Sequence, residues 1–278
     1  MAKPITTRIF TVANQKGGVG KTTSAVNVAA ALAMGGLKTL IIDLDPQGNA
    51  STAFGISRDE VSGMYEVIIK DLPMQSAALK IPGYPNLEVI PATQSLANAE
   101  VELVPMVARE MRLKKSLNNY LLDAANKGER FDYVIIDCPP SLGLLTINAL
   151  VAAQELLIPI QCEYYSLEGL TLLLHTVSLI QEHLNPNIKL TTILLTMFDG
   201  RTRLANDVAA EVRKHYSAEL IDIPIPRAVR ISEAPSYGQT VMTYDPASNG
   251  AEAYGLVARE IARRGALSSN SNSEKGVG

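Results

Sequence analysis

The sequence has no tryptophan, only four phenylalanines and only two cysteines among 278 residues. The cysteines, Cys138 and Cys162, form no C-x-x-C pair and are too few for a disulfide framework, which fits a reducing compartment. No uncharged apolar run approaches the roughly 18 residues of a membrane span, and the first ten residues lack the apolar core of a signal peptide. We therefore expect a cytoplasmic protein that does not enter a membrane.

A strong charge imbalance is also missing, since 25 basic and 28 acidic residues leave a formal net charge of −3. This balance gives no global attraction to nucleic acid or to a membrane surface, so such a partner would have to bind a local patch. The length suits one large α/β domain, which we expect over residues 1–267. The polar segment 268–278, SSNSNSEKGVG, is expected to be disordered.

What the chain does have is an alternation of short β-branched apolar runs with longer helical patterns. This alternation is typical of a doubly wound, mostly parallel sheet with helices on both faces. Gly55–Pro85 is interrupted by three prolines and reads as an irregular insertion at the rim. The expected strands are Arg8–Ala13, Thr39–Asp43, Leu87–Ile90, Tyr133–Asp137, Glu155–Ile160, Leu190–Thr196 and Leu220–Ile223. Helices are expected from about Lys21, Leu142, Leu167, Leu204 and Ala247, and over Met111–Ala125.

The segment NQKGGVGKTT, residues 14–23, lies between the first strand and an alanine-rich helix. Glycines in such a loop let backbone N–H groups converge on phosphates at a helix N-terminus. Lys21 would reach the β- and γ-phosphates, and the Thr22 hydroxyl would bind Mg²⁺. The usual pattern has a glycine where Gln15 stands, and Lys16 is an additional cation. The alternative is a glycine-rich turn without a ligand. The candidate ATP-binding residues here are Lys16, Gly17, Gly18, Val19, Gly20, Lys21, Thr22 and Thr23.

Two further segments place carboxylates at the carboxyl ends of strands, where open α/β sheets bind ligands. In DLDPQGN, Asp43 continues the strand while Asp45 projects into the loop, so Asp45 is the better candidate to orient an attacking water. The alternative is that both aspartates only cap a turn or a helix. In YVIIDCPPS, Asp137 follows an apolar strand in the Walker B arrangement, which holds Mg²⁺. Cys138 is interpreted as a small packed residue.

Four segments carry a resemblance to a known family: KGGVGKTT, DLDPQGNAS, VIIDCPPSLG and IPIPRAVRISEAPSYGQTVMTYDPASNGAEAY. Together they resemble ParA/Soj-type chromosome and plasmid partitioning ATPases, which have a P-loop NTPase fold of the deviant Walker A class. The resemblance covers residues from about 8 to about 264. It implies an ATPase that uses ATP and Mg²⁺, is weak alone, and is stimulated by a ParB-type centromere-binding protein.

The resemblance also implies roles for individual residues. Lys16 would reach across an ATP-dependent homodimer to the partner's nucleotide, and Gly17 would lie at that interface. With Lys16 and Lys21, Asp45 would be catalytic, acting on the hydrolytic water. The metal would lie at Thr22 and Asp137. Pro226 and Arg227 would lie near the adenine.

Nucleoid association through non-specific binding of double-stranded DNA is a further implication of the resemblance. The basic residues in the last third of the chain could contact phosphates without reading sequence. A solvated charged surface is the alternative for any one of them. The candidates are Arg201, Arg203, Arg213, Lys214 and Arg230.

Other proteins share the deviant loop, and the sequence separates them to different degrees. A MinD-like ATPase for division-site placement cycles on a membrane through a C-terminal amphipathic helix, but the polar tail has no apolar face. An iron–sulfur carrier would need cysteines placed to hold a cluster, but Cys138 lies within YVIIDCPPS and Cys162 is solitary. A tyrosine kinase of this class would have a tyrosine-rich C-terminal tail, but the last 24 residues contain no tyrosine. A scaffold that binds ATP without hydrolysing it is opposed by Asp45.

Overall fold

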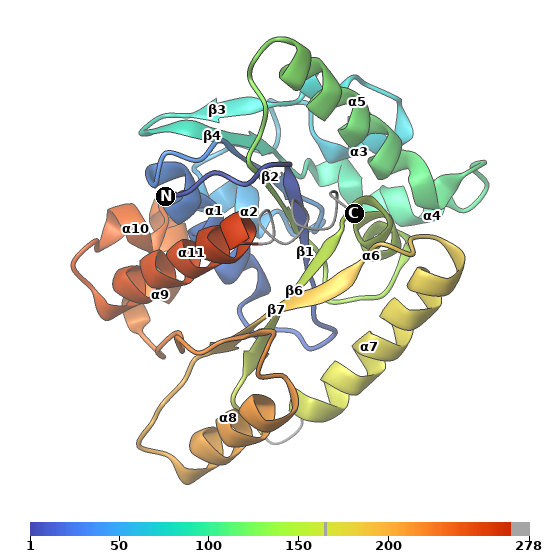
Figure 1. Ribbon diagram of the computed structural model, residues 1–278. Helices are drawn as coiled ribbons and strands as arrows, with labels where there is room; N and C mark the ends of the chain where they lie inside the picture. The colour runs from blue at the N-terminus through green and yellow to red at the C-terminus, as the bar shows by residue number, and fades with distance from the viewer. Residues whose placement is uncertain (164–165, 268–278) are drawn as a thin grey trace, which may run out of the picture.

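Eight strands form one sheet at the centre of the protein (Figure 1), and the computed structural model describes residues 1–163 and 166–267. The strand order is β3-β4-β2-β5-β1-β6-β7-β8, and every neighbouring pair is parallel except β3 and β4. This arrangement confirms the doubly wound, mostly parallel sheet. The predicted disordered tail, 268–278, lies outside the described residues. The strands are β1 (Arg8–Val12), β2 (Thr39–Asp43), β3 (Leu79–Ile81), β4 (Tyr84–Ile90), β5 (Tyr133–Asp137), β6 (Glu155–Gln161), β7 (Lys189–Thr196) and β8 (Leu220–Ile221).

Helices connect these strands and start within a few residues of the predicted positions. Besides four 3₁₀ turns in the described ranges, there are short helices that the sequence patterns did not reveal. The helices are α1 (Lys21–Met34), α2 (Asn49–Ala53), α3 (Met64–Ile69), α4 (Ala99–Leu103), α5 (Arg112–Asn126), α6 (Leu144–Ala152), α7 (Ser166–His183), α8 (Arg203–His215), α9 (Val229–Glu233), α10 (Val241–Tyr244) and α11 (Asn249–Leu267). None of the helices within 1–163 and 166–267 is long and apolar enough to cross a bilayer.

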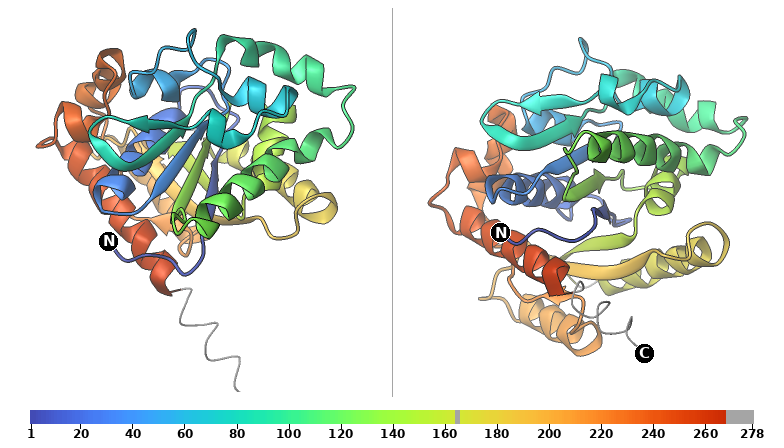
Figure 2. Two further views of the ribbon diagram at one scale, coloured as in Figure 1. Left: turned by 90° about the horizontal axis from the view of Figure 1, so that it is seen from above. Right: turned by 45° about the horizontal axis from the view of Figure 1, so that its top comes forward.

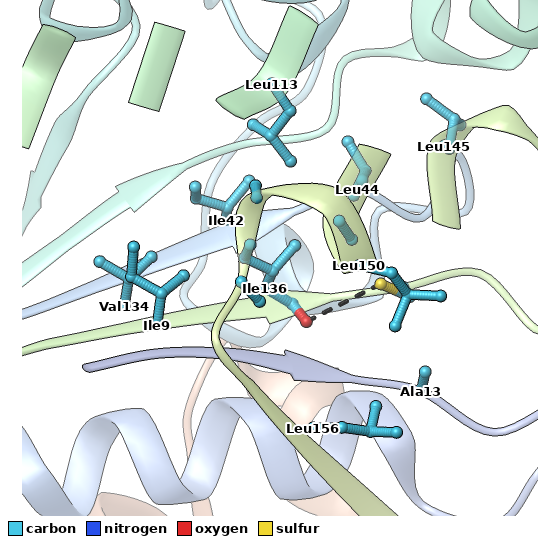
Figure 3. Packing of buried hydrophobic residues seen from close by; sticks show 14 of the residues in the cluster. Ile9, Ala13, Ile42, Leu44, Leu113, Val134, Ile136, Leu145, Leu150 and Leu156 are labelled. Atoms are coloured by element: carbon cyan, nitrogen blue, oxygen red, sulfur yellow. Dashed lines mark hydrogen bonds between the residues drawn. The ribbon is translucent and has the colours of Figure 1, made fainter. Parts of the chain in front are cut away.

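The helices form two layers, one on each face of the sheet (Figures 1 and 2). Helices α1 and α11 pack together on one face, with α9 and α10 beside them, whereas α5, α6, α7 and α8 cover the other. Side chains of a strand alternate between the faces. In β1, Phe10 and Val12 join the core under α1, while Ile9 joins the core under α6 that Figure 3 shows. Strands buried on both sides explain the continuous apolar runs in the sequence.

The segment Gly55–Pro85 is more regular than the sequence suggested. It contains α3 and the edge strand β3, which pairs antiparallel with β4. The strand predicted over Leu87–Ile90 begins earlier, because β4 starts at Tyr84 and includes Pro85. Pro85 is tolerated there since β2 pairs with β4 only from Leu87 onward, so no neighbour on that side needs its missing N–H.

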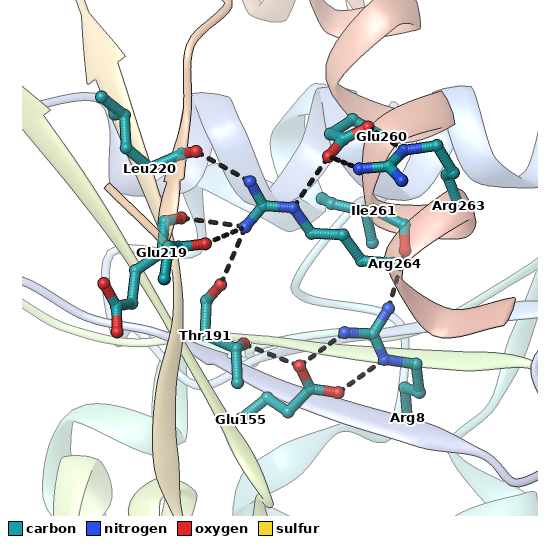
Figure 4. A network of polar contacts seen from close by, with 10 residues as sticks. Arg8, Glu155, Thr191, Glu219, Leu220, Glu260, Ile261, Arg263 and Arg264 are labelled. Atoms are coloured by element: carbon teal, nitrogen blue, oxygen red, sulfur yellow. Dashed lines mark hydrogen bonds and ion pairs between the residues drawn. The ribbon is translucent and has the colours of Figure 1, made fainter. Parts of the chain in front are cut away.

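The amino ends of the strands hold a network of paired charges (Figure 4). Arg8 at the start of β1 donates from Nε and Nη2 to the two carboxylate oxygens of Glu155 at the start of β6, both at 2.6 Å. Its Nη1 donates to the Ile261 carbonyl in α11 at 2.7 Å. Arg264, one turn further along α11, donates to four backbone carbonyls, those of Thr191, Ala218, Glu219 and Leu220. The guanidinium groups of Arg8 and Arg264 therefore join α11 to the amino ends of the strands through several hydrogen bonds each.

Candidate functional site

The glycine-rich loop lies between β1 and α1, at the carboxyl edge of the sheet. Gly18 and Gly20 have φ of +73° and +85°, a region in which side chains other than glycine are strained. A Cβ added at Gly17 or Gly18 would meet nothing within 4 Å, so the inner side of the loop faces open space. Helix α1 begins directly after it at Lys21. The loop and helix thus have the form of a cradle of N–H groups, which suits a phosphate.

Neighbouring strands hold this loop in place. Asn14 Nδ2 donates to the Pro159 carbonyl in β6 at 2.8 Å, and the Lys16 N–H donates to Asn14 Oδ1 at 3.1 Å. The Thr196 hydroxyl at the end of β7 donates to the Val19 carbonyl at 2.8 Å. The loop is therefore fixed before a ligand arrives, as an anion site requires.

Lys21 is buried at the floor of the cradle, and its Nζ donates to the Lys16 carbonyl at 3.1 Å. Burial lowers the pKa of Lys21, while the charges of Asp137 and Asp45 oppose this decrease. Thr22 and Thr23 follow in the first turn of α1 and are half-buried. An ammonium with one carbonyl partner and two nearby carboxylates is well placed to bind phosphate oxygens.

Two aspartates stand side by side at the ends of β2 and β5, since Asp43 pairs in register with Asp137 and both are fully buried. Asp43 accepts from the Ser51 N–H at 2.8 Å and the Ser51 hydroxyl at 2.7 Å. Burial raises the pKa of Asp43 from its ordinary 3.8 to about 6, although the Ser51 hydrogen bonds lower it. Asp43 therefore has a structural partner in α2.

Asp137 has no such partner: within 1–163 and 166–267, neither of its buried carboxylate oxygens accepts a hydrogen bond of ordinary geometry, although the Thr22 hydroxyl lies close to it. Burial and then the Asp43 charge raise the pKa of Asp137 well above its usual range, against the opposing effects of the Thr22 side chain and Lys21. A buried carboxylate without a hydrogen bond is costly unless a ligand completes it. The described residues contain no cluster of three or more His, Cys, Asp or Glu for a metal. One carboxylate and a hydroxyl fit Mg²⁺, which usually keeps its waters and takes the remaining oxygens from substrate phosphates.

Asp45 lies in the loop between β2 and α2 and is largely buried. Its Oδ1 accepts from the Gln47 N–H at 2.9 Å, and its carbonyl accepts from the Gly48 N–H at 2.8 Å. The Asp45 charge acts on the pKa of both Lys21 and Asp137, so all three groups belong to one electrostatic site. The structure thus brings together the carboxylates and cation that the sequence predicted.

Lys16 contacts Glu163, a residue that the sequence analysis did not identify. Its Nζ forms an ion pair of 2.6 Å with Glu163 Oε2, just after β6, and both side chains are partly exposed. Gln161 Nε2 donates to the other oxygen of Glu163 at 2.6 Å. In this single chain the additional lysine is held by its own subunit. A contact between residues 147 positions apart gives no local sequence signal.

The two thiols take no part in the site. Cys138 is fully buried beside Asp137, and burial raises its pKa well above the usual range. Burial likewise raises the pKa of Cys162 to about 11. Protonated, buried thiols are inert as nucleophiles and ligands, which supports the interpretation of Cys138 as a packing residue.

A cavity of about 110 Å³ opens beside the phosphate loop, between α1, the end of β7 and the segment before α9. Pro226 and Arg227 line it, together with Gly20 and Thr23 of the loop. The structure therefore places the two residues predicted near the adenine next to the phosphate cradle. Thr196 and Met197 lie in the same wall and were not anticipated.

The five candidate DNA-binding residues lie in three places, and all form ion pairs. Arg201 and Arg203 lie at the amino end of α8, Arg213 and Lys214 in its last turn, and Arg230 in α9 (Figure 1). All five side chains are at least two-fifths exposed. Their acidic partners are Asp199, Asp207, Asp222, Glu211, and Glu233 with Asp245. DNA binding at these positions would have to displace these carboxylates.

A strand, a fixed glycine loop, a buried lysine and an unpartnered carboxylate on the adjacent strand define a P-loop nucleotide-binding protein of the deviant Walker A class. A family model described as an AAA domain matches residues 7–190. The sporulation initiation inhibitor protein Soj of Bacillus subtilis is 49% identical over 93% of this chain and 99% of its own. The chromosome partitioning protein ParA of Myxococcus xanthus is 48% identical over 92% and 88%. The chain belongs to the ParA/Soj family of partitioning ATPases.

A solved structure with a bound nucleotide gives independent support for a nucleotide site. A Mycobacterium smegmatis protein named cobyrinic acid a,c-diamide synthase, with a bound ATP analogue and magnesium, is 37% identical. It superimposes with a TM-score of 0.78 over 92% of this chain and 95% of that chain.

Proposed function

We propose that the chain is a DNA-segregation ATPase that binds ATP with Mg²⁺, dimerises face to face, and binds double-stranded DNA without sequence preference. Hydrolysis, stimulated by a ParB-type centromere-binding partner, then opens the dimer and releases the DNA. Such a protein would be nucleoid-associated. The names of the relatives at 48–49% identity favour partitioning over the amide synthesis in the name of the 37% identical structure.

The observation that carries the proposal is the buried Asp137 carboxylate, which accepts no hydrogen bond of ordinary geometry and lies close to the Thr22 hydroxyl and to the charge of Lys21. Bound Mg²⁺ would neutralise charge on the β- and γ-phosphates. Thr22 and Asp137 would hold it, and Lys21 would stabilise the negative charge that develops on the phosphoryl oxygens. Asp45 would orient the water that attacks phosphorus as the bond to the ADP oxygen breaks.

Lys16 supplies the proposed link between nucleotide and dimer. A cation brought from the other subunit neutralises charge on the transferring group, as an arginine finger does. Its ion pair with Glu163 must open first, so dimerisation exchanges an intramolecular carboxylate for the partner's phosphates. Gly17 is exposed at the rim of the cradle, where the two subunits would meet.

The test is co-sedimentation with random duplex DNA in ADP and in ATP, at low and moderate salt. We expect binding in ATP only, a steep loss with salt, and little change with sequence. Asp45→Ala should trap the DNA-bound ATP dimer because water is no longer oriented, and Lys16→Ala should bind ATP without dimerising. Equal binding in both nucleotides would contradict the proposal. ATP-dependent sedimentation with anionic vesicles instead of DNA would favour the MinD-like alternative.

A further inference from the structure

Arg58, which follows α2, uses its guanidinium to join two loops at the carboxyl edge of the sheet. Nε donates to the Ala92 carbonyl at 2.9 Å, and Nη2 to the Thr93 carbonyl at 3.4 Å. Nη1 donates to the Gln47 carbonyl at 2.6 Å, and Nη2 also donates to the Pro46 carbonyl. Within the described ranges no salt bridge joins Arg58 to a carboxylate, so its hydrogen bonds go to the backbone. Its contacts therefore depend on the conformation of the two loops and not on the side chains that they carry.

One of these loops contains Asp45. Gln47 is held from both sides, because its N–H donates to Asp45 Oδ1 while its carbonyl accepts from Arg58. Arg58 also lies directly on Gly48, where an added Cβ would be 2.2 Å from Nε and 2.3 Å from Cζ. Gly48 has φ +66° and immediately precedes α2. The guanidinium thus covers the turn that begins at Asp45.

The other loop follows β4, the neighbour of β2, and connects back to the buried aspartates. The Ala92 N–H donates to Ser51 Oγ at 3.0 Å, and the Ser51 hydroxyl donates to Asp43. Ala92 is therefore held through its N–H by a chain that leads to Asp43, and through its carbonyl by Arg58. These contacts tie the Asp45 loop to the sheet from the outside.

We propose that Arg58 is a positioning residue that holds the Asp45 loop in the conformation needed to orient the hydrolytic water. The proposal rests on the hydrolytic role of Asp45. A guanidinium has five donors in a planar fork, so it can serve the four carbonyls at once. A lysine ammonium has three donors on one atom and cannot span both loops. A small displacement of a group that orients a reactant lowers the rate strongly. Loss of Arg58 should therefore lower the rate of hydrolysis and leave the affinity for ATP largely unchanged.

The experiment measures single-turnover hydrolysis and ATP affinity for Arg58→Lys and Arg58→Ala in the full chain with DNA. We expect the rate to fall at least tenfold, with the dissociation constant for ATP within about twofold of the parent, since Arg58 contacts neither the phosphate loop nor the 110 Å³ cavity. Hydrogen exchange at the Gln47 and Gly48 amides should rise in Arg58→Lys without nucleotide. The matched control is Arg264→Lys, which also removes a guanidinium bound to four carbonyls, at the other edge of the sheet. It should leave the rate unchanged.

A double-mutant cycle separates positioning from general destabilisation. Arg58→Lys added to Asp45→Ala should cause no further loss of rate, because the group that it positions is gone. An unchanged rate or unchanged exchange in Arg58→Lys, an equal loss in Arg264→Lys, or additive losses with Asp45→Ala would overturn the proposal. Normal turnover by Asp45→Ala would instead refute the proposed function, whereas its inactivity beside a fully active Arg58→Lys would refute only this inference.

Discussion

Two buried aspartates lie at opposite ends of β5, and their surroundings differ. Asp132, just before the strand, accepts from the Lys38 N–H at 2.9 Å and from Arg130 Nη2 at 3.2 Å. The carboxylate of Asp137, the last residue of the strand, has no hydrogen-bond partner in the described part of the chain and lies beside Asp43. The neighbouring strands at the amino edge also hold paired charges, since Arg8 of β1 donates to both carboxylate oxygens of Glu155 of β6. A buried charge whose hydrogen bonds are complete fastens strands together, whereas one left incomplete marks the place of a ligand.

The largest effect is expected from Asp137→Asn. Removing the negative charge should weaken Mg²⁺-dependent ATP binding by about 100-fold, or about 3 kcal/mol, because the metal loses its protein carboxylate. Unfolding free energy without nucleotide should stay the same or rise, since an unpartnered buried charge is removed. Isothermal titration with ATP in Mg²⁺ and in EDTA, with urea unfolding, checks both.

The matched control on the same strand is Asp132→Asn. It should lower stability, because the Lys38 N–H and Arg130 lose a charged acceptor, and leave Mg²⁺-dependent affinity unchanged. If both variants behaved alike, the distinction between the two ends of β5 would be wrong.

The second prediction concerns the amino edge. Glu155→Ala should lower the free energy of unfolding by about 2–3 kcal/mol, because it leaves the mostly buried Arg8 guanidinium without its carboxylate. Urea denaturation measures this loss, and ATP affinity of the folded protein should not change. Asp123→Ala is the control, since it removes an exposed pair with Lys127 and should cost less than about 0.5 kcal/mol. A weaker ATP affinity in Glu155→Ala would contradict a purely structural amino edge.

The pH dependence of stability should have opposite signs at the two edges. The pKa of Asp43 is raised by burial to about 6, so its contribution to metal-free stability is present below about 4 and lost as pH rises through 6. The Arg263 hydrogen bond lowers the pKa of Glu260, beside Arg264, to about 2. Its contribution is present above 4.5 and lost as pH falls through about 2.

Urea unfolding from pH 2 to 8, without metal or nucleotide, separates these two contributions. Asp43→Asn should reduce the decline between pH 4 and 6, of which Asp137, whose pKa burial also raises, supplies the rest. Glu260→Gln should flatten the acid limb. A decline between pH 4 and 6 that survives when both Asp43→Asn and Asp137→Asn are present would assign it to another group.

The strands of the sheet and the glycine-rich loop before Lys21 could be predicted because each is formed by one continuous stretch of sequence. Strands buried on two faces read as apolar runs, and the loop ending at Lys21 sits between a strand and a helix. The edge strand β3 was missed because Leu79–Ile81 is short and is followed directly by Pro82. The contacts of Arg58 and Glu163 were missed because their partners are distant in the chain, or are carbonyls, which every residue has. Whether Asp137 finds a partner depends on packing, which a motif does not report.

The smallest effect is expected where the carboxyl edge does hold a paired charge, at Lys16 and Glu163. An ion pair with side chains 35% and 45% exposed contributes at most about 1 kcal/mol, and salt screens it. Glu163→Gln should therefore strengthen ATP-dependent dimerisation about two- to fivefold in sedimentation, since Lys16 no longer leaves a carboxylate to reach the partner's nucleotide. The gain should shrink at high salt, and Glu182→Gln, which neutralises an exposed carboxylate on α7, should show none. Weaker dimerisation in Glu163→Gln would instead mean that this carboxylate holds Lys16 in its working position. The carboxyl edge would then contain a structural ion pair of the same kind as the amino edge.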